Sequence, residues 1–220
     1  MNSTPSIANA ASVATQSKKD HITGLGRGPV SINNLQSPNS LKIIQFNING
    51  ISTRIILELA LTEGAQIIAL QETKLKTITS LKIKGYNIFR LDRQNRSGGG
   101  LAFLIKNINY QCININRKIT DGSNLEIQGI RIIWRGKPLS IFNMYHPPDL
   151  KSLPTDLQDL FTVGTICLVD LNGKHPIWGC SIANPRGNEL LGIIDDKCFF
   201  ILNDGTATHF SHSYIIRKKL

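Results

Sequence analysis

The chain has 220 residues and a formal net charge of +10, from 25 Lys and Arg residues against 15 Asp and Glu residues. This length supports one sizeable hydrophobic core, and an apolar content of 41% with 18% charged residues is that of an ordinary globular domain. The excess of positive charge favours polyanionic partners. Nucleic acid is the first expectation and an acidic membrane surface the second.

The cysteine spacing and the hydropathy pattern limit where the protein works. None of the four cysteines forms a C-x-x-C pair, so neither a zinc site nor a disulfide framework is indicated, and a reducing compartment fits best. No run approaches the 18 apolar residues of a membrane span, and the polar first residues lack the apolar core of a signal peptide. We therefore expect an intracellular protein of the nucleus or cytoplasm, with no membrane partner.

The chain divides near residue 40. Residues 1–40 are rich in Ser, Asn, Thr, Gly and Pro, which predicts a disordered polar leader. From residue 41 onward, apolar runs alternate with turn signals. Residues 41–46 and 66–70 predict strands, and a helix capped by Ser52 lies between them. The domain therefore begins as β–α–β.

Shorter strands are predicted beyond this start. They lie at residues 101–105, 127–134, 139–145, 165–169 and 199–202. The runs 127–134 and 139–145 are separated by a plausible hairpin turn, and a second helix is expected at about residues 186–195. Strands that mostly meet through hairpins, with helices outside them, predict an α/β protein of two packed sheets covered by helices.

A carboxylate and a carboxamide directly follow the apolar run 165–169. Asp170 and Asn172 are two residues apart, so a strand continuing through them places both side chains on the same side. This pair suits a metal-dependent phosphodiesterase, in which the carboxylate takes a proton from water and the amide holds the nucleophile or a phosphate oxygen. An Asx-turn that closes a loop is the alternative for this pattern alone.

Three other predicted strands also end in polar groups, in the segments 45–50, 71–74 and 143–148. Strand ends are where open α/β architectures build their sites. The order and content of the four segments resemble the endonuclease/exonuclease/phosphatase superfamily. The form D-L-N-G-K-H-P-I-W-G looks like the apurinic-type endonuclease domain of non-LTR retrotransposons, and the resemblance runs from residue 41 to about residue 209.

The resemblance implies a role for each matching position. Glu72 matches the main metal-ligating carboxylate, for Mg²⁺ or Mn²⁺, and Asn47 matches the amide that positions the metal and the catalytic carboxylate. Tyr145 matches the tyrosine that contacts the scissile phosphate. Asp170 matches the residue that orients or deprotonates the attacking water, and Asn172 the one that binds the phosphate.

Thr208 matches a loop threonine near the DNA in this family, with a simple turn as the alternative. The other positions also have structural alternatives. Asn47 would cap a strand-end turn, and Glu72 would be a solvated charge paired with Lys74. Tyr145 would be a core aromatic ring with one edge in contact with water.

The chain also departs from the family pattern. Val169 stands where members usually have Gly, so the backbone at Asp170 is expected to differ. We interpret His175 and Trp178 as parts of a structural turn, because the catalytic His of the family lies in a later Ser-Asp-His segment. That segment and the Ile-Asp-Leu-like strand before it are absent after His209.

The fold implied is a four-layer α/β sandwich of two packed mixed β-sheets flanked by helices, lacking the last strands and spanning residues 41–220. The function implied is a fragment of a retrotransposon DNA endonuclease, ancestrally fused to a reverse transcriptase and monomeric. It would nick DNA with magnesium, with activity impaired by the missing Asp and His. The alternatives are an inactive nucleic-acid-binding remnant, a phosphatase of the same fold and a translated relic without function.

Overall fold

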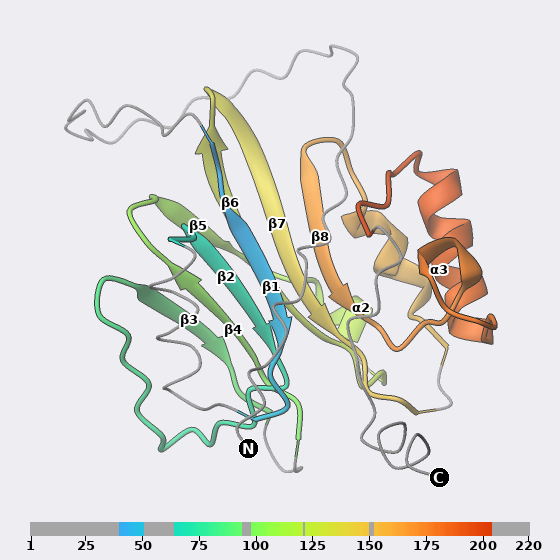
Figure 1. Ribbon diagram of the computed structural model, residues 1–220, viewed down its shortest axis with the longest axis horizontal. Coiled ribbons are helices and arrows are strands. Elements are labelled where there is room, and N and C mark those ends of the chain that lie inside the picture. The colour runs from blue at the N-terminus through green and yellow to red at the C-terminus, as the bar shows by residue number, and fades with distance from the viewer. Residues whose placement is uncertain (1–39, 51–63, 94–97, 121, 150–151, 204–220) are drawn as a thin grey trace, which may run out of the picture.

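The computed structural model describes residues 40–50, 64–93, 98–120, 122–149 and 152–203, and in these ranges eight strands form two four-stranded sheets (Figure 1). The first sheet has the order β1-β2-β4-β3, with β1 (Ile43–Asn47), β2 (Ile67–Gln71), β3 (Asn87–Leu91) and β4 (Leu101–Ile105). The second has the order β5-β6-β7-β8, with β5 (Tyr110–Ile113), β6 (Glu126–Trp134), β7 (Lys137–Tyr145) and β8 (Thr165–Asp170).

Each sheet contains one parallel pair, so both are mixed, as predicted. Strand β1 pairs with β2 in parallel and β7 pairs with β8 in parallel, while all other neighbours are antiparallel. Figure 1 shows β1, β2, β7 and β8 running toward the same end of the molecule. The polar residues that close these four strands are therefore gathered at one end.

The layer between the sheets is mostly apolar, with one buried polar contact in which Gln71 of β2 donates to Asn143 of β7. Along β2, Ile67 and Ala69 face this layer, while Ile68 and Leu70 pack on the outer side of the first sheet. Every residue of β2 and β4 is buried, as expected for central strands covered on both faces. The layer consists of Ile67, Ala69, Phe103, Ile105, Ile130, Ile132, Ile141 and Leu168.

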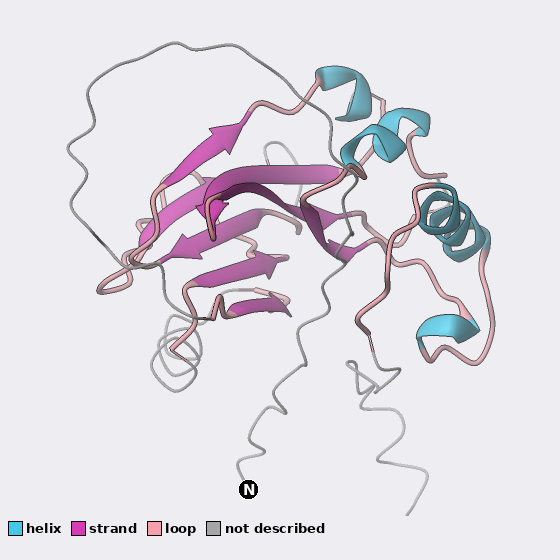
Figure 2. Ribbon diagram, turned by 90° about the horizontal axis from the view of Figure 1, so that it is seen from above, coloured by secondary structure: helices cyan, strands magenta, loops and turns pink. Residues whose placement is uncertain are grey.

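Helical segments cover the outer face of the second sheet. They are α2 (Arg117–Thr120), α3 (Pro185–Asp196) and the 3₁₀ turns η1 (Thr155–Leu160) and η2 (Pro176–Trp178). Figure 2 shows them together on one side of the strands. Leu190 and Ile194 of α3 and Leu157 of η1 pack in one cluster with Phe142 and Met144 of β7. None of the helices in the described ranges has the length and apolar content needed to cross a membrane.

Local sequence signals explain several element boundaries. Helix α3 begins where Asn184 caps it by accepting a hydrogen bond from the Gly187 N–H, with proline at the next position. The β6–β7 hairpin turns through Arg135 and Gly136, both with positive φ, as a two-residue type I′ turn requires. Both predictions, the helix and the hairpin, are confirmed.

The strand predicted at residues 199–202 is wrong. The Phe199 N–H bonds to the Ile194 carbonyl at 2.9 Å, and Cys198 adopts a left-handed backbone (φ 54°), so this segment closes α3. The Phe199 ring packs edge-on against Phe161, with ring centroids 5.0 Å apart. Phe199 and Ile201 pack in the core beside α3, whereas Phe200 and Leu202 are exposed, and no strand forms there.

Three predictions fall outside the described residues. They are the helix capped by Ser52, the leader apart from Ser40, and the loop that contains Thr208.

Candidate functional site

Strand register aligns three polar side chains at one end of the second sheet. Asp170 of β8 is the partner of Tyr145 in β7, and Tyr145 is also the partner of Glu126 in β6. Two residues before Asp170, Leu168 lies in the layer between the sheets. Because alternate residues of a strand share a face, Asp170 points toward the first sheet.

The first sheet contributes an amide that bridges two carboxylates. Asn47 closes β1, and its Nδ2 donates to Glu72 Oε1 at 2.9 Å and to Asp170 Oδ2 at 2.6 Å. Gln45 Nε2 donates to the Val169 carbonyl at 2.9 Å, which holds β1 against β8. The structure therefore brings together Asn47, Glu72 and Asp170, three residues that the sequence predicted for the site.

Tyr145 lies beside the same carboxylates. Its side chain is buried and its hydroxyl hydrogen-bonds Glu72. Burial raises the pKa of Tyr145 well above its ordinary value, and the negative charges of Glu72 and Asp170 raise it further. The hydroxyl is therefore protonated at neutral pH and available as a donor.

A half-buried ion pair that the sequence analysis missed lies behind Tyr145. Arg93 Nε bonds Glu126 Oε1, and the Gly100 N–H donates to Glu126 Oε2 at 2.7 Å. The Arg93 guanidinium lies 5.9 Å from the centroid of the Tyr145 ring. Burial raises the pKa of Glu126, while Arg93 opposes that rise.

The sequence signal for this pair is the glycine run 98–100, just before β4. A Cβ on Gly99 would lie 2.4 Å from Glu126 Oε1 and 2.7 Å from the Arg93 guanidinium carbon. Glycine is needed there because the backbone passes so close to the pair.

Several site residues have a left-handed backbone. Glu72 and Asn172 both have φ 51°, and Asn49 and Lys74 have φ 44° and 53°. Such conformations are uncommon outside glycine and cost of order 1–3 kcal/mol each. They gather where side chains are held for a task, so this strain supports placing the site here.

Asn172 is engaged elsewhere. Strand β8 ends at Asp170, so strand alternation does not extend to Asn172. Its Nδ2 donates to the His146 carbonyl at 2.9 Å, and its own carbonyl accepts from Asn184 Nδ2 at 3.0 Å. The amide of Asn172 therefore braces the loop after β7 and is not bonded to the carboxylates that Asn47 bridges.

The H-P-x-W-G segment forms a turn, as its interpretation predicted. His175 Nδ1 accepts from the Ile177 N–H at 3.2 Å and caps η2, while Gly179 ends η2 with φ 89°. Trp178 Nε1 donates to the Gly173 carbonyl at 3.0 Å. These contacts give the segment a structural role.

A buried arginine ties two site loops together. Arg186 of α3 donates from Nη1 to the carbonyls of Pro147, at 2.9 Å, and Leu171, at 3.0 Å. Its Nη2 donates to the carbonyl and the carboxylate of Asp149. The loops after Tyr145 and Asp170 are thus fixed to one side chain, which sequence spacing did not reveal.

The expected effect of Val169 is absent. Val169 pairs with Met144 inside β8, and its φ is not positive. β-Branched residues are favoured in strands, and Asp170 accordingly has regular strand backbone.

The donor set fits a hard divalent cation. Two carboxylates, Glu72 and Asp170, face one amide group across a few ångströms, and a cation would relieve their mutual repulsion. Mg²⁺ is commonly held by one or two carboxylates together with waters and substrate phosphate. In the described part of the chain, no three His, Cys, Asp or Glu residues gather as a metal cluster.

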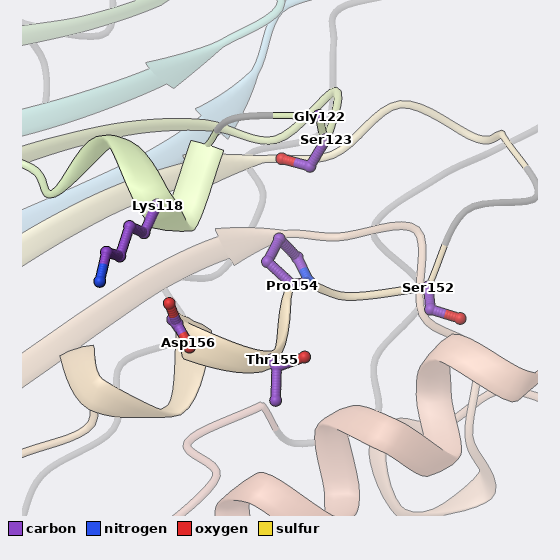
Figure 3. Close-up of a pocket in the computed structure, with 7 residues that line it drawn as sticks. All are labelled: Lys118, Gly122, Ser123, Ser152, Pro154, Thr155 and Asp156. Carbon is purple, nitrogen blue, oxygen red and sulfur yellow. The ribbon is translucent and has the colours of Figure 1, made fainter.

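A separate hollow of about 370 Å³ opens between α2 and η1, as Figure 3 shows. It is lined by Lys118, Gly122, Ser123, Ser152, Pro154, Thr155 and Asp156. None of the predicted site residues lines it, so it is distinct from the site at the strand ends.

Comparisons with known proteins find one family model and one curated relative. A family model described as endonuclease-reverse transcriptase matches residues 139–216. The probable RNA-directed DNA polymerase from transposon BS of Drosophila melanogaster is 25% identical over 182 residues, which are 79% of this chain and 20% of that protein. The chain thus spans only a fifth of that relative.

Two solved structures share the fold. The endonuclease domain of TRAS1, a telomere-specific non-LTR retrotransposon, has a TM-score of 0.56 and 21% identity, covering 75% of this chain and 76% of that one. The catalytic domain of Xenopus laevis APE2 has a TM-score of 0.50 and 20% identity, covering 70% and 67%.

Proposed function

We propose that this chain, which belongs to the endonuclease/exonuclease/phosphatase superfamily and to its retrotransposon-type endonuclease domains, hydrolyses DNA phosphodiesters with a divalent metal ion. The observation that carries this proposal is the Asn47 amide, which bridges Glu72 and Asp170 from the ends of separate strands. A protonated tyrosine, Tyr145, stands beside them.

The metal is proposed to be Mg²⁺ or Mn²⁺, held chiefly by Glu72 with Asp170 nearby. When bound, it would supply Lewis-acid charge neutralisation at the phosphate. About a fifth of the Glu72 side chain is exposed, so a small ligand can reach it. Asn47 orients both carboxylates through its two hydrogen bonds.

The proton and phosphate roles fall to the second sheet. We assign Asp170 to accept the proton of the attacking water. We assign Tyr145 to donate its hydroxyl proton in a hydrogen bond to a phosphate oxygen, which requires that hydroxyl to exchange its bond with Glu72 for one with the substrate. Asn172 is proposed to bind the phosphate. One hydrogen of its Nδ2 is donated to the His146 carbonyl, and the second hydrogen is the donor that we assign to the phosphate.

The names of the relatives suggest which domain would lie beside this one. A nick leaves a 3′-hydroxyl, which a reverse transcriptase extends. The Drosophila relative is named an RNA-directed DNA polymerase and is about five times longer than the aligned part. We therefore infer that this domain nicks target DNA beside a polymerase domain.

The test is nicking of a supercoiled plasmid by the full chain in Mg²⁺, Mn²⁺ or EDTA. We expect metal-dependent nicking that Asp170→Ala abolishes and that Asp196→Ala, an exposed change at the end of α3, leaves intact. Metal-independent nicking, or equal nicking by both variants, would show that the activity does not come from this site.

A second candidate is DNA binding without hydrolysis. The observation favouring it is the net charge of +10, which attracts DNA whether or not the site is catalytic. A gel shift that is retained by wild type and Asp170→Ala, with no nicking by either in Mg²⁺ or Mn²⁺, selects this candidate.

A further inference from the structure

The segment between β2 and β3 is long, basic and directly attached to the site. It begins just after Glu72 and runs beyond β3 at the edge of the first sheet (Figure 1). Its four lysines are all exposed, and no Asp or Glu occurs from residue 73 to residue 91. They are Lys74, Lys76, Lys82 and Lys84. A one-sign surface of this kind attracts a polyanion.

The tip of this segment is braced. The Thr79 N–H bonds to the Lys76 carbonyl at 2.8 Å and closes a turn. The Arg90 guanidinium of β3 donates to the carbonyls of Thr79 and Lys76 and pairs with Asp92. Farther along, Ile83 is buried in the outer cluster of the first sheet. The turn is therefore held in place by contacts at both its ends.

The braced turn presents an apolar side chain to solvent. Ile78 is 92% exposed, the most of any large apolar residue in the described ranges. A single exposed apolar residue is ordinary on a protein surface. This one differs because an arginine fixes the turn that carries it and because exposed lysines flank it.

The turn lies within reach of a duplex held at the site. Strands β2 and β3 both pair with β4, so they are two strand spacings apart, about 10 Å. Arg90, near the end of β3, holds the turn through the Lys76 and Thr79 carbonyls, so a DNA duplex lying across the strand ends would meet the turn close to Glu72.

We propose that residues 74–84 form a DNA-binding finger in which Lys76 and Lys82 bind backbone phosphates and Ile78 inserts between base pairs. This rests on the proposed function, because it takes duplex DNA as the substrate. Lysines neutralise phosphates without reading sequence, and apolar wedges such as isoleucine unstack a base step and kink the duplex. The finger thereby favours sites where the duplex is easily deformed.

The experiment uses the full chain and duplexes that carry 2-aminopurine at successive positions, in EDTA so that no cleavage occurs. Wild type should raise the 2-aminopurine fluorescence at one step, because unstacking relieves quenching. Ile78→Ala should lose most of that rise and weaken binding by less than about tenfold, since phosphate contacts supply most of the affinity. Ile133→Ala, an equally simple change at an exposed isoleucine near the β6–β7 turn, should keep the rise.

The lysines are tested by salt dependence. Lys76→Ala with Lys82→Ala should lower the slope of log Kd against log salt by about 0.9 for each phosphate that is no longer neutralised. Lys137→Ala, an exposed change at the start of β7, should leave the slope unchanged.

Three outcomes would overturn the proposal. Unchanged fluorescence and slope in the finger variants, while Asp170→Ala still abolishes nicking, refute the finger and leave the proposed function standing. If Ile78→Ala changes the sedimentation of the protein but changes neither the 2-aminopurine fluorescence nor DNA binding, the isoleucine serves self-association. No DNA binding by wild type removes the proposed function and the finger together.

Discussion

The two sheets build their halves of the site in different ways. On the second sheet, Tyr145 and Asp170 are paired members of regular strands, and Glu126 continues the same row. On the first sheet, Glu72 follows the end of its strand with a left-handed backbone, as does Lys74. One half is positioned by register, whereas the other is positioned by strained turns.

This difference determines how each half tolerates change. A register position is specified by every pair in the ladder, because a shift of one residue would turn the apolar set outward. A left-handed Glu72 costs free energy locally, and it persists because Gly50 N–H bonds to the Glu72 carbonyl at 2.7 Å and Asn47 holds its carboxylate. The Asn47 amide is what joins the two halves.

The largest expected effect tests whether the halves act as one unit. Glu72→Gln and Asp170→Asn should each lower kcat for nicking by about 10²–10⁴. The double variant should be little worse than the poorer single variant, because groups that act together are strongly non-additive. The measurement is plasmid nicking by all four proteins, with circular dichroism as the check on folding. If the reduction in kcat of the double variant equals the product of the two single reductions, the carboxylates work independently.

A smaller effect is expected from a change in the packing of α3 against the loop that follows β8. A Cβ on Gly187 in α3 would lie 1.9 Å from the Lys174 carbonyl oxygen, in the loop that follows Asp170. Gly187→Ala should therefore destabilise the fold by about 2–4 kcal/mol, in the range of severe steric changes, and should lower activity by displacing that loop.

Gly192 provides the matched control in the same helix. Nothing lies within 4 Å of a Cβ placed on it, so Gly192→Ala should stabilise the protein by about 0.5–1 kcal/mol through helix propensity. Urea unfolding of both variants measures the contrast. Equal stability in the two variants would show that α3 and the loop separate easily.

Tyr145 gives a prediction about pH. Its folded-state pKa is raised, mainly by burial, and tyrosine in the unfolded chain ionises near pH 10. The stability that Tyr145 contributes is therefore present below about pH 10 and lost as pH rises above that value. Tyr145→Phe should lose less stability above pH 10 than wild type, and should lower nicking about tenfold through the lost hydroxyl. Parallel pH curves for the two proteins would place the titration elsewhere.

The features that sequence predicted well are those with local causes. Apolar runs separated by turn signals located most strands, and a helical apolar pattern located α3, because each signal is determined by a few adjacent residues. The edge strands β3 and β5 were not predicted. Their residues are all half-buried or exposed, without alternation, which leaves a weak periodic signal.

The parts of the site that were missed depend on contacts between distant segments. Arg186 meets the carbonyls of Pro147 and Leu171, and Glu126 meets Arg93 and the Gly100 N–H. No spacing rule links these positions, because the partners come together only when the sheets pack. Asn47, Glu72, Tyr145 and Asp170 were predictable from motif resemblance, which already carries that three-dimensional information.

The smallest expected effect concerns Lys74, on the first-sheet side. Its Nζ bonds Asn49 Oδ1 and lies 3.9 Å from Glu72 Oε2, with about 40% of the side chain exposed. Exposed pairs of this kind contribute about 0–1 kcal/mol and are screened by salt. Lys74→Met should therefore change kcat/KM by about fivefold or less, and the difference should shrink at high salt. Lys74→Arg should behave like wild type if only the charge matters. A loss much larger than this, unchanged by salt, would mean that Lys74 holds the strained turn at Glu72 in place, so that the first-sheet half depends on its side-chain contacts far more than on its backbone hydrogen bonds.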